Sequence, residues 1–255
     1  MRVINVMLLA SLVSVSAEAG SVLKVDAKDA AGKMEPREMW YAQDGMLRID
    51  DVDARGNVTE STVVRDDMIW KIDPAGRTYT RVDPASLKQM MGGKSAQMEA
   101  MIANLPPERR AMIEARMAKM QQKAASTEYT FSDTGKSDHS GQYSCHLWQE
   151  QRNGKPYASY CVVPTASLPA GAELDAALKK AVATTGQIVS SVPQLAKAGE
   201  HITRLGSLHG FPVSSRVGES EERVLTSAQS QALAADKFAI PKGFTEKPLG
   251  EHEGD

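Results

Sequence analysis

The chain is 255 residues long and nearly neutral, with 30 Lys and Arg against 32 Asp and Glu and a formal net charge of -2. The two signs are mixed along the sequence, and this argues against nucleic acid as a partner, because binding phosphates needs a basic face. A chain of this length can bury a core without a structural metal, so we expect one domain.

The first nineteen residues have the pattern of a secretory signal peptide. Arg2 precedes an apolar run from Val3 to Val15, and Ala17-Glu18-Ala19 then precedes Gly20. This pattern predicts cleavage after Ala19 and a periplasmic or secreted product. The residue directly after the cleavage site is Gly20 and not a cysteine, so we expect no lipid anchor. No later segment reaches the roughly 20 apolar residues of a membrane span. The mature protein is expected to be soluble.

Residues 38–82 alternate strand-forming stretches with turn signals, which is typical of an antiparallel meander. The expected strands are Met39 to Ala42, Met46 to Asp51, Val58 to Arg65, Met68 to Asp73 and Thr78 to Val82. In the fourth of these, Met68, Trp70 and Ile72 share one face. We expect that face to be buried and to point inward.

Residues 84–124 form a helical insertion rich in methionine. Asp83-Pro84 predicts a helix start, Gly92-Gly93 a stop, and Ser95 and Pro106-Pro107 the starts of two further helices. Seven of the thirteen methionines lie in this insertion.

These methionines allow three interpretations. They are the core-facing stripe of helices packed on the sheet, or an adaptable apolar surface that accepts acyl chains or unfolded polypeptide. The pairs Met98 with Met101 and Met117 with Met120 also suggest a soft-metal site for copper. The insertion contains no histidine, which disfavours the copper interpretation.

Cys145 and Cys161 predict one disulfide, because they are the two cysteines of an exported chain. They flank an expected hairpin around Asn153-Gly154. A two-residue turn there would put the two sulfurs on opposite sides of the sheet, so we predict a three-residue bulged loop that pairs Gln151 with Lys155 and Cys145 with Cys161.

The remaining segments mix helix and strand. A strand is expected at Ser126 to Asp133, and a helical pattern runs from Ala172 to about Leu205, with an interruption at Pro193. Strands follow at Phe211 to Val217 and Glu222 to Thr226. Residues 246–255, after the Phe238 to Phe244 segment, are predicted to form a flexible tail.

The chain resembles an uncharacterised family of exported bacterial proteins that is related in shape to the periplasmic carrier of outer-membrane lipoproteins. The resemblance rests on the meander, the cysteine hairpin, Gly210-Phe211-Pro212-Val213 and the closing Phe238-x-Ile240-Pro241-x-Gly243-Phe244. It implies an α+β fold, in which a curved, unclosed antiparallel half-barrel spans residues 20–245 and helices cover its concave face. No cavity residue of the carrier can be transferred to this sequence.

We therefore expect a non-catalytic binding or carrier protein for a lipid, a lipoprotein or another hydrophobic ligand. Its candidate contacts are Met68, Trp70 and Ile72 with the lid residues Met98, Met101, Met117 and Met120. His139, His146, His201, His209 and His252 show no metal-ligand spacing, and the motifs of common enzymes are missing, so neither catalysis nor a cofactor is predicted.

The alternative function is a chaperone-like or stress protein that acts through the Met-rich helices. Leu105-Pro106-Pro107-Glu108-Arg109 is similar to the Leu-Thr-Pro-Glu-Gln type motifs that open helices in small periplasmic chaperones, and it differs from them at the second and fifth positions. The sequence leaves the ligand, any membrane receptor and the oligomeric state open.

Overall fold

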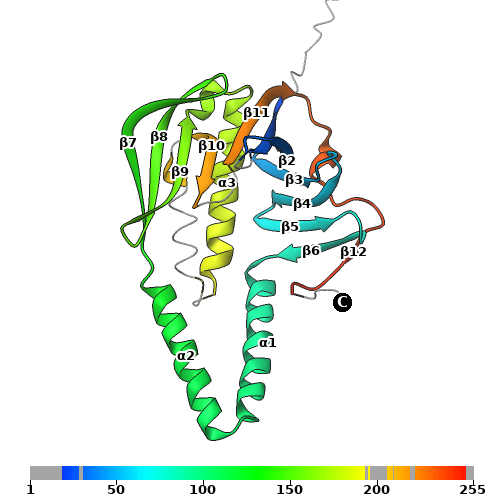
Figure 1. Ribbon diagram of the computed structural model, residues 1–255. Helices are drawn as coiled ribbons and strands as arrows, with labels where there is room; N and C mark the ends of the chain where they lie inside the picture. The colour runs from blue at the N-terminus through cyan, green and yellow to red at the C-terminus, as the bar shows by residue number, and fades with distance from the viewer. Residues whose placement is uncertain are drawn as a thin grey trace, which may run out of the picture.

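A computed structural model describes residues 19–28, 31–192, 195, 206–208, 210–218 and 222–250. The expected leader lies outside these residues except for Ala19, and so does most of the helical pattern after Pro193. Twelve strands of the described chain form one sheet in the order β12-β6-β5-β4-β3-β2-β1-β11-β10-β9-β8-β7. The sheet curves around α3 without closing, which confirms the expected α+β half-barrel (Figure 1).

The meander is confirmed strand by strand. It comprises β2 (Met34–Gln43), β3 (Met46–Val52), β4 (Val58–Arg65), β5 (Met68–Asp73) and β6 (Thr78–Val82). Asp44-Gly45 and Asp66-Asp67 form two-residue turns in which both residues have positive φ. Such turns match the twist of the flanking strands, and Asp and Gly are among the residues that tolerate this conformation.

One central strand was not predicted from the sequence. β1 (Gly20–Lys28) lies in the middle of the sheet and pairs with β2 on one side and with β11 (Glu222–Gln231) on the other. Nearly all of its residues are buried. Ser21, which is fully buried, donates a hydrogen bond to the Pro169 carbonyl at 3.1 Å. The strand begins directly after the expected cleavage site.

The helix α3 (Gly171–Ser190) covers the concave face of the sheet (Figure 1). Leu174 and Ala177 are completely buried, and with Ala181 they pack into the main apolar cluster of the sheet. The short side chains let the helix lie close to the strands. The helical pattern expected from Ala172 is confirmed as far as Ser190, where α3 ends, and most of the pattern beyond Pro193 lies outside the described residues.

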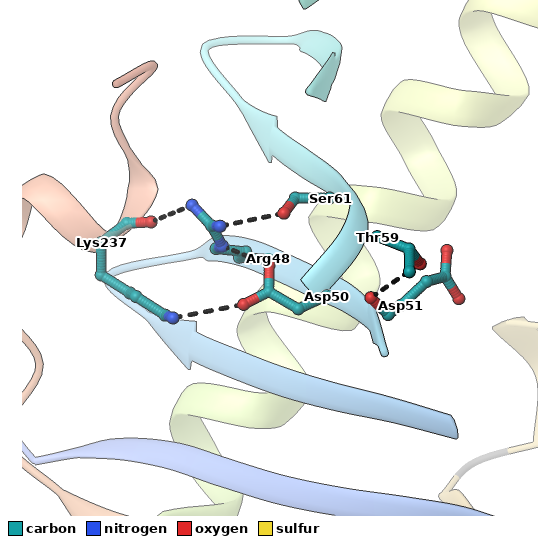
Figure 2. Close-up of polar contacts among 6 residues, drawn as sticks. All are labelled: Arg48, Asp50, Asp51, Thr59, Ser61 and Lys237. Atoms are coloured by element: carbon teal, nitrogen blue, oxygen red, sulfur yellow. Dashed lines mark hydrogen bonds and ion pairs between the residues drawn. The ribbon is translucent and has the colours of Figure 1, made fainter. Parts of the chain in front are cut away.

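The C-terminal residues 232–250, which we call the strap, cover the opposite, convex face of β2 to β6. Phe238, at the end of the short helix η4 (Ala235–Phe238), packs with Val63 and Ile72. Arg48 and Lys237 both hold the buried Asp50 beneath the strap, as Figure 2 shows. Side chains of these strands are therefore buried on both faces.

The strap extends further than expected. β12 (Thr245–Glu246) pairs in parallel with β6, and the Lys247 amide donates to the Tyr79 carbonyl at 2.8 Å. Leu249 packs near Leu87. The prediction of a loose tail from residue 246 is therefore wrong for residues 246–249, since the edge of β6 offers them hydrogen-bond partners.

The Met-rich insertion forms two helices rather than three. α1 (Pro84–Ala103) and α2 (Pro107–Ala125) form an arm that projects away from the sheet (Figure 1). α1 continues through Gly92 and Gly93, so the predicted stop there is wrong. A helical glycine costs about 1 kcal/mol relative to alanine, and this penalty weakens a helix without ending it.

The start of α1 is fixed by a capping box. The Asp83 carboxylate accepts a hydrogen bond from the Ser86 amide at 2.7 Å, and the Ser86 hydroxyl accepts one from the Asp83 amide. The bond from the Ser86 amide is the main reason why the pKa of Asp83 lies below its usual value. The predicted helix start at Asp83-Pro84 is confirmed.

The cysteine hairpin confirms the disulfide and corrects its register. β7 (Tyr129–Ser140), β8 (Tyr143–Arg152) and β9 (Lys155–Val163) are consecutive, and Cys145 is bonded to Cys161. The turn has two residues, with Arg152 opposite Lys155, so the predicted three-residue loop is wrong. The extra residue is Tyr157, where the ladder shifts by one.

This shift places Cys161 opposite Leu147, so the disulfide joins two diagonal neighbours on one face of the sheet. Pro156 stands beside the irregularity and has no amide hydrogen to give to a ladder. A one-residue register correction is needed to bridge the cysteines, and the chain makes it inside the strand instead of in the turn.

Replacing both cysteines by serine is expected to lower the free energy of unfolding by about 1–3 kcal/mol. The entropy model gives roughly 3 kcal/mol for a loop of this size, and the hairpin already closes this loop. Urea unfolding of the double variant beside the oxidised protein measures the difference. A loss above about 4 kcal/mol would show that the disulfide also stabilises contacts outside the hairpin.

Candidate functional site

A cavity of about 650 Å³ lies between α3 and the concave face of the sheet. Its apolar wall comes from β1, β2, β10 (Phe211–Val217), β11, α3 and the short helix η3 (Gly206–Leu208). The apolar lining residues are Val25, Trp40, Leu178, Val182, Leu208, Phe211, Pro212 and Leu225. Protein pockets for small molecules have volumes of roughly 300–1,000 Å³ and mostly apolar linings, so this space suits a ligand of lipid size.

The aromatic part of the wall is a pair of packed rings. The ring of Trp40 meets the ring of Phe211 edge to face, with 5.5 Å between the centroids and 89° between the planes. Leu225 is almost fully buried behind them. Aromatic pairs in this geometry contribute beyond their buried area, so the wall should persist without a ligand.

One ion pair stands in this apolar wall. The carboxylate of Glu38, with a side chain 6% exposed, contacts the guanidinium of Arg223, whose side chain is 45% exposed. The indole Nε1 of Trp40 donates a second hydrogen bond to Glu38 at 2.7 Å. Glu38 is thereby held from two sides, while the more exposed Arg223 reaches between the carboxylate and solvent.

More polar groups line other parts of the cavity. Thr165 and Asp175 are joined by a hydrogen bond of 3.4 Å, and Lys179 forms an ion pair with Asp175 at 2.6 Å. Tyr160 also lines the cavity and donates to the Glu150 carboxylate at 2.6 Å. Burial, and then this bond, raise the pKa of Tyr160 far above its usual value, so its hydroxyl stays protonated.

The strand residues predicted as ligand contacts lie elsewhere. Trp70 and Ile72 belong to the apolar cluster under the strap, on the convex face. The residue of β5 that packs toward α3 is Ile69. The predicted shared face of Met68, Trp70 and Ile72 is thus real, but its inward orientation is wrong, because a strand covered on both faces gives no sign of which side faces the helix.

The methionines predicted as lid residues lie on the arm. Met101 and Met120 are each 64% exposed, and Met98 is 41% exposed. Met117 lines a groove between α1 and α2. None of the four lines the cavity, so the interpretation of the Met-rich helices as a lid or as core packing on the sheet is wrong for them; the cover is α3.

The residue pattern of β2 could have pointed to the cavity. Glu38, Trp40 and Ala42 alternate along β2, so a carboxylate shares one face with two side chains that pack in the core. A charge on the apolar face of a strand marks a buried ion pair or a site. Arg223 could not be predicted in this way, because its partner Glu38 is 185 residues away in the sequence.

Two comparisons with known proteins bear on this chain. No protein-family model matches the sequence, and a search of curated proteins found no match. Within the described residues, no helix is long and apolar enough to span a membrane, and no group of three or more His, Cys, Asp or Glu side chains could hold a metal ion. We base the function proposed below on the cavity under α3.

Proposed function

We propose that this chain is an exported, non-catalytic binding or carrier protein for a hydrophobic ligand, and that the ligand occupies the cavity under α3. The observation that carries the proposal is an apolar space of about 650 Å³ with a single ion pair in its sheet wall. The ligand class that fits is an amphiphile: an acyl chain against Trp40, Phe211 and Leu225, and a polar group near Arg223.

Two further features support the proposal. The disulfide fits a chain that works outside the reducing cytoplasm. The curved, unclosed sheet with a helix on its concave face is the architecture that the resemblance to the lipoprotein carrier implies. With this support we propose that the chain is related to that family and that its ligand is a lipid or a lipidated polypeptide.

Binding of a fluorescent fatty acid tests the proposal. The wild-type protein should bind the probe with saturation, and native mass spectrometry of protein from its own host should show a co-purifying lipid. The double variant Leu178→Trp with Val182→Trp places two indoles in the cavity, and the probe's affinity should fall by at least about 10-fold, or about 1.4 kcal/mol.

The matched control is Ala176→Trp with Ala183→Trp, which adds the same indoles to exposed positions of α3. Its affinity should equal that of the wild type. The proposal is wrong if the wild type neither binds the probe nor carries a lipid, or if the cavity variant binds as tightly as the control.

A further inference from the structure

The arm carries most of the exposed apolar surface of the molecule. Eight large apolar side chains in the described residues are strongly exposed, and five of them lie on α1 and α2. These five are Met98, Met101, Met112, Ile113 and Met120. An exposed apolar patch that is concentrated on one projecting element marks an interaction surface.

The same arm is basic in an otherwise acidic chain. Residues 84–125 hold seven Lys and Arg against three Glu, whereas the whole chain has a net charge of -2. The charge is therefore separated between the arm and the remainder of the protein, and the arm should be drawn toward a negatively charged partner.

The two properties meet on one face of α2. Arg109, Met112, Arg116 and Met120 follow at spacings of three or four residues, and such positions lie one above the other on a helix. Ile113 and Lys119 flank this line. All six side chains are exposed, and we call them the outer face of α2.

Of the two acidic residues of α2, Glu114 lies away from this face, and Glu108 lies at its N-terminal edge, four residues before Met112. Glu114 lines the groove toward α1 together with Arg110 and Met117. Glu108 lies in the first turn of the helix, where its charge suits the helix dipole. Among the described residues, no carboxylate pairs with Arg109, Arg116 or Lys119, so their charges are available to a partner.

We propose that the outer face of α2 docks on an anionic phospholipid surface. Cations beside flexible apolar side chains are the pattern of a helix that lies in the plane of a membrane interface, with its apolar groups about 5–10 Å deep. The face is about 16 Å long, at 1.5 Å per residue. Nucleic acid would use the cations and leave Met112, Ile113 and Met120 in water, so a lipid surface fits better.

Co-sedimentation of the full chain with vesicles tests this assignment. The protein should bind vesicles of phosphatidylglycerol and phosphatidylcholine and bind pure phosphatidylcholine far more weakly. Reversing the charge at Arg109→Glu, Arg116→Glu and Lys119→Glu should lower the partition coefficient by at least about 100-fold, because each cation lost near an anionic surface removes roughly a factor of five and each added carboxylate is repelled.

The matched control is Arg55→Glu, Lys136→Glu and Lys242→Glu, which makes the same charge change at exposed positions outside the arm. It should bind nearly as well as the wild type. A second measurement does not depend on charge: the fluorescence of Met112→Trp should shift to the blue on binding and be quenched by brominated lipid.

Three results would overturn the proposal. These are equal binding of the wild type to anionic and neutral vesicles, an equal loss of binding in both triple variants, and binding of the chain to duplex DNA but to no vesicle. Because the assay uses the membrane surface and no cavity ligand, failure here leaves the proposed carrier function standing, and failure of fatty-acid binding leaves this proposal standing.

Discussion

Asp50→Ala is expected to lower the free energy of unfolding by about 3–5 kcal/mol. Asp50 is 1% exposed, and its carboxylate contacts Arg48 Nε at 2.5 Å and Lys237 Nζ at 3.3 Å (Figure 2). Removing the shared anion leaves Arg48 of β3 and Lys237 of the strap without their counter-charge. Losing one partner of a buried ion pair is costly because the other charge stays buried.

The loss should also loosen the strap. Arg48 donates to the Lys237 carbonyl at 3.0 Å and to Ser61 Oγ at 2.9 Å, so its position depends on Asp50 and in turn holds the strap. Urea unfolding followed by tryptophan fluorescence measures the stability, and proteolysis within residues 232–250 reports the release of the strap.

Asp51→Ala is the matched control for this prediction. Asp51 is the next residue of β3 and is partly exposed, and Thr59 Oγ1 bonds to its backbone carbonyl, which the substitution keeps. We expect a change below about 0.5 kcal/mol. Equal losses in the two variants would mean that the network around Asp50 does not anchor the strap.

Gly171→Ala is expected to destabilise the protein by about 3 kcal/mol. A Cβ at this first residue of α3 would lie 1.9 Å from the Thr165 carbonyl oxygen and 2.7 Å from its carbon. Both atoms belong to the backbone, so either the helix or the preceding turn must move. Overpacking of this kind usually costs 1–3 kcal/mol, and a backbone obstacle puts the cost at the upper end.

The shift should reach the cavity as well. Leu178 and Val182 line it from the same helix, so probe affinity should fall along with stability. Gly93→Ala in α1 is the control, since nothing lies within 4 Å of its Cβ. There the substitution should stabilise by about 0.5–1 kcal/mol. Destabilisation by Gly93→Ala, or no effect of Gly171→Ala, would contradict this account.

The local parts of the fold could be predicted from the sequence. The strands from β3 to β6 and β10 were found within a residue or two because alternation and turn residues such as Asp44-Gly45 act over short distances. The capping box at Asp83 acts equally locally. β1 was missed because its apolar residues follow the apolar leader directly and are buried on both faces, which removes the alternation.

The site depended on contacts between distant segments, and these could not be predicted. Whether Ile69 or Trp70 faces α3 is decided by the strap, which covers the other side of β5. The methionine spacing predicted the helices of the arm but did not predict that they project away from the sheet. Spacing shows which side chains share a face, and only the tertiary fold shows what that face meets.

The pairing of β1 with β11 has a consequence for how the chain folds. The first described strand finds its neighbour some two hundred residues later, at Gly20 opposite Gln231 and along the whole strand. The middle of the sheet therefore cannot be completed until almost the entire polypeptide has emerged. Such long-range pairing makes folding slow, and a chain cut short before β11 would present an open, aggregation-prone strand edge to its neighbours.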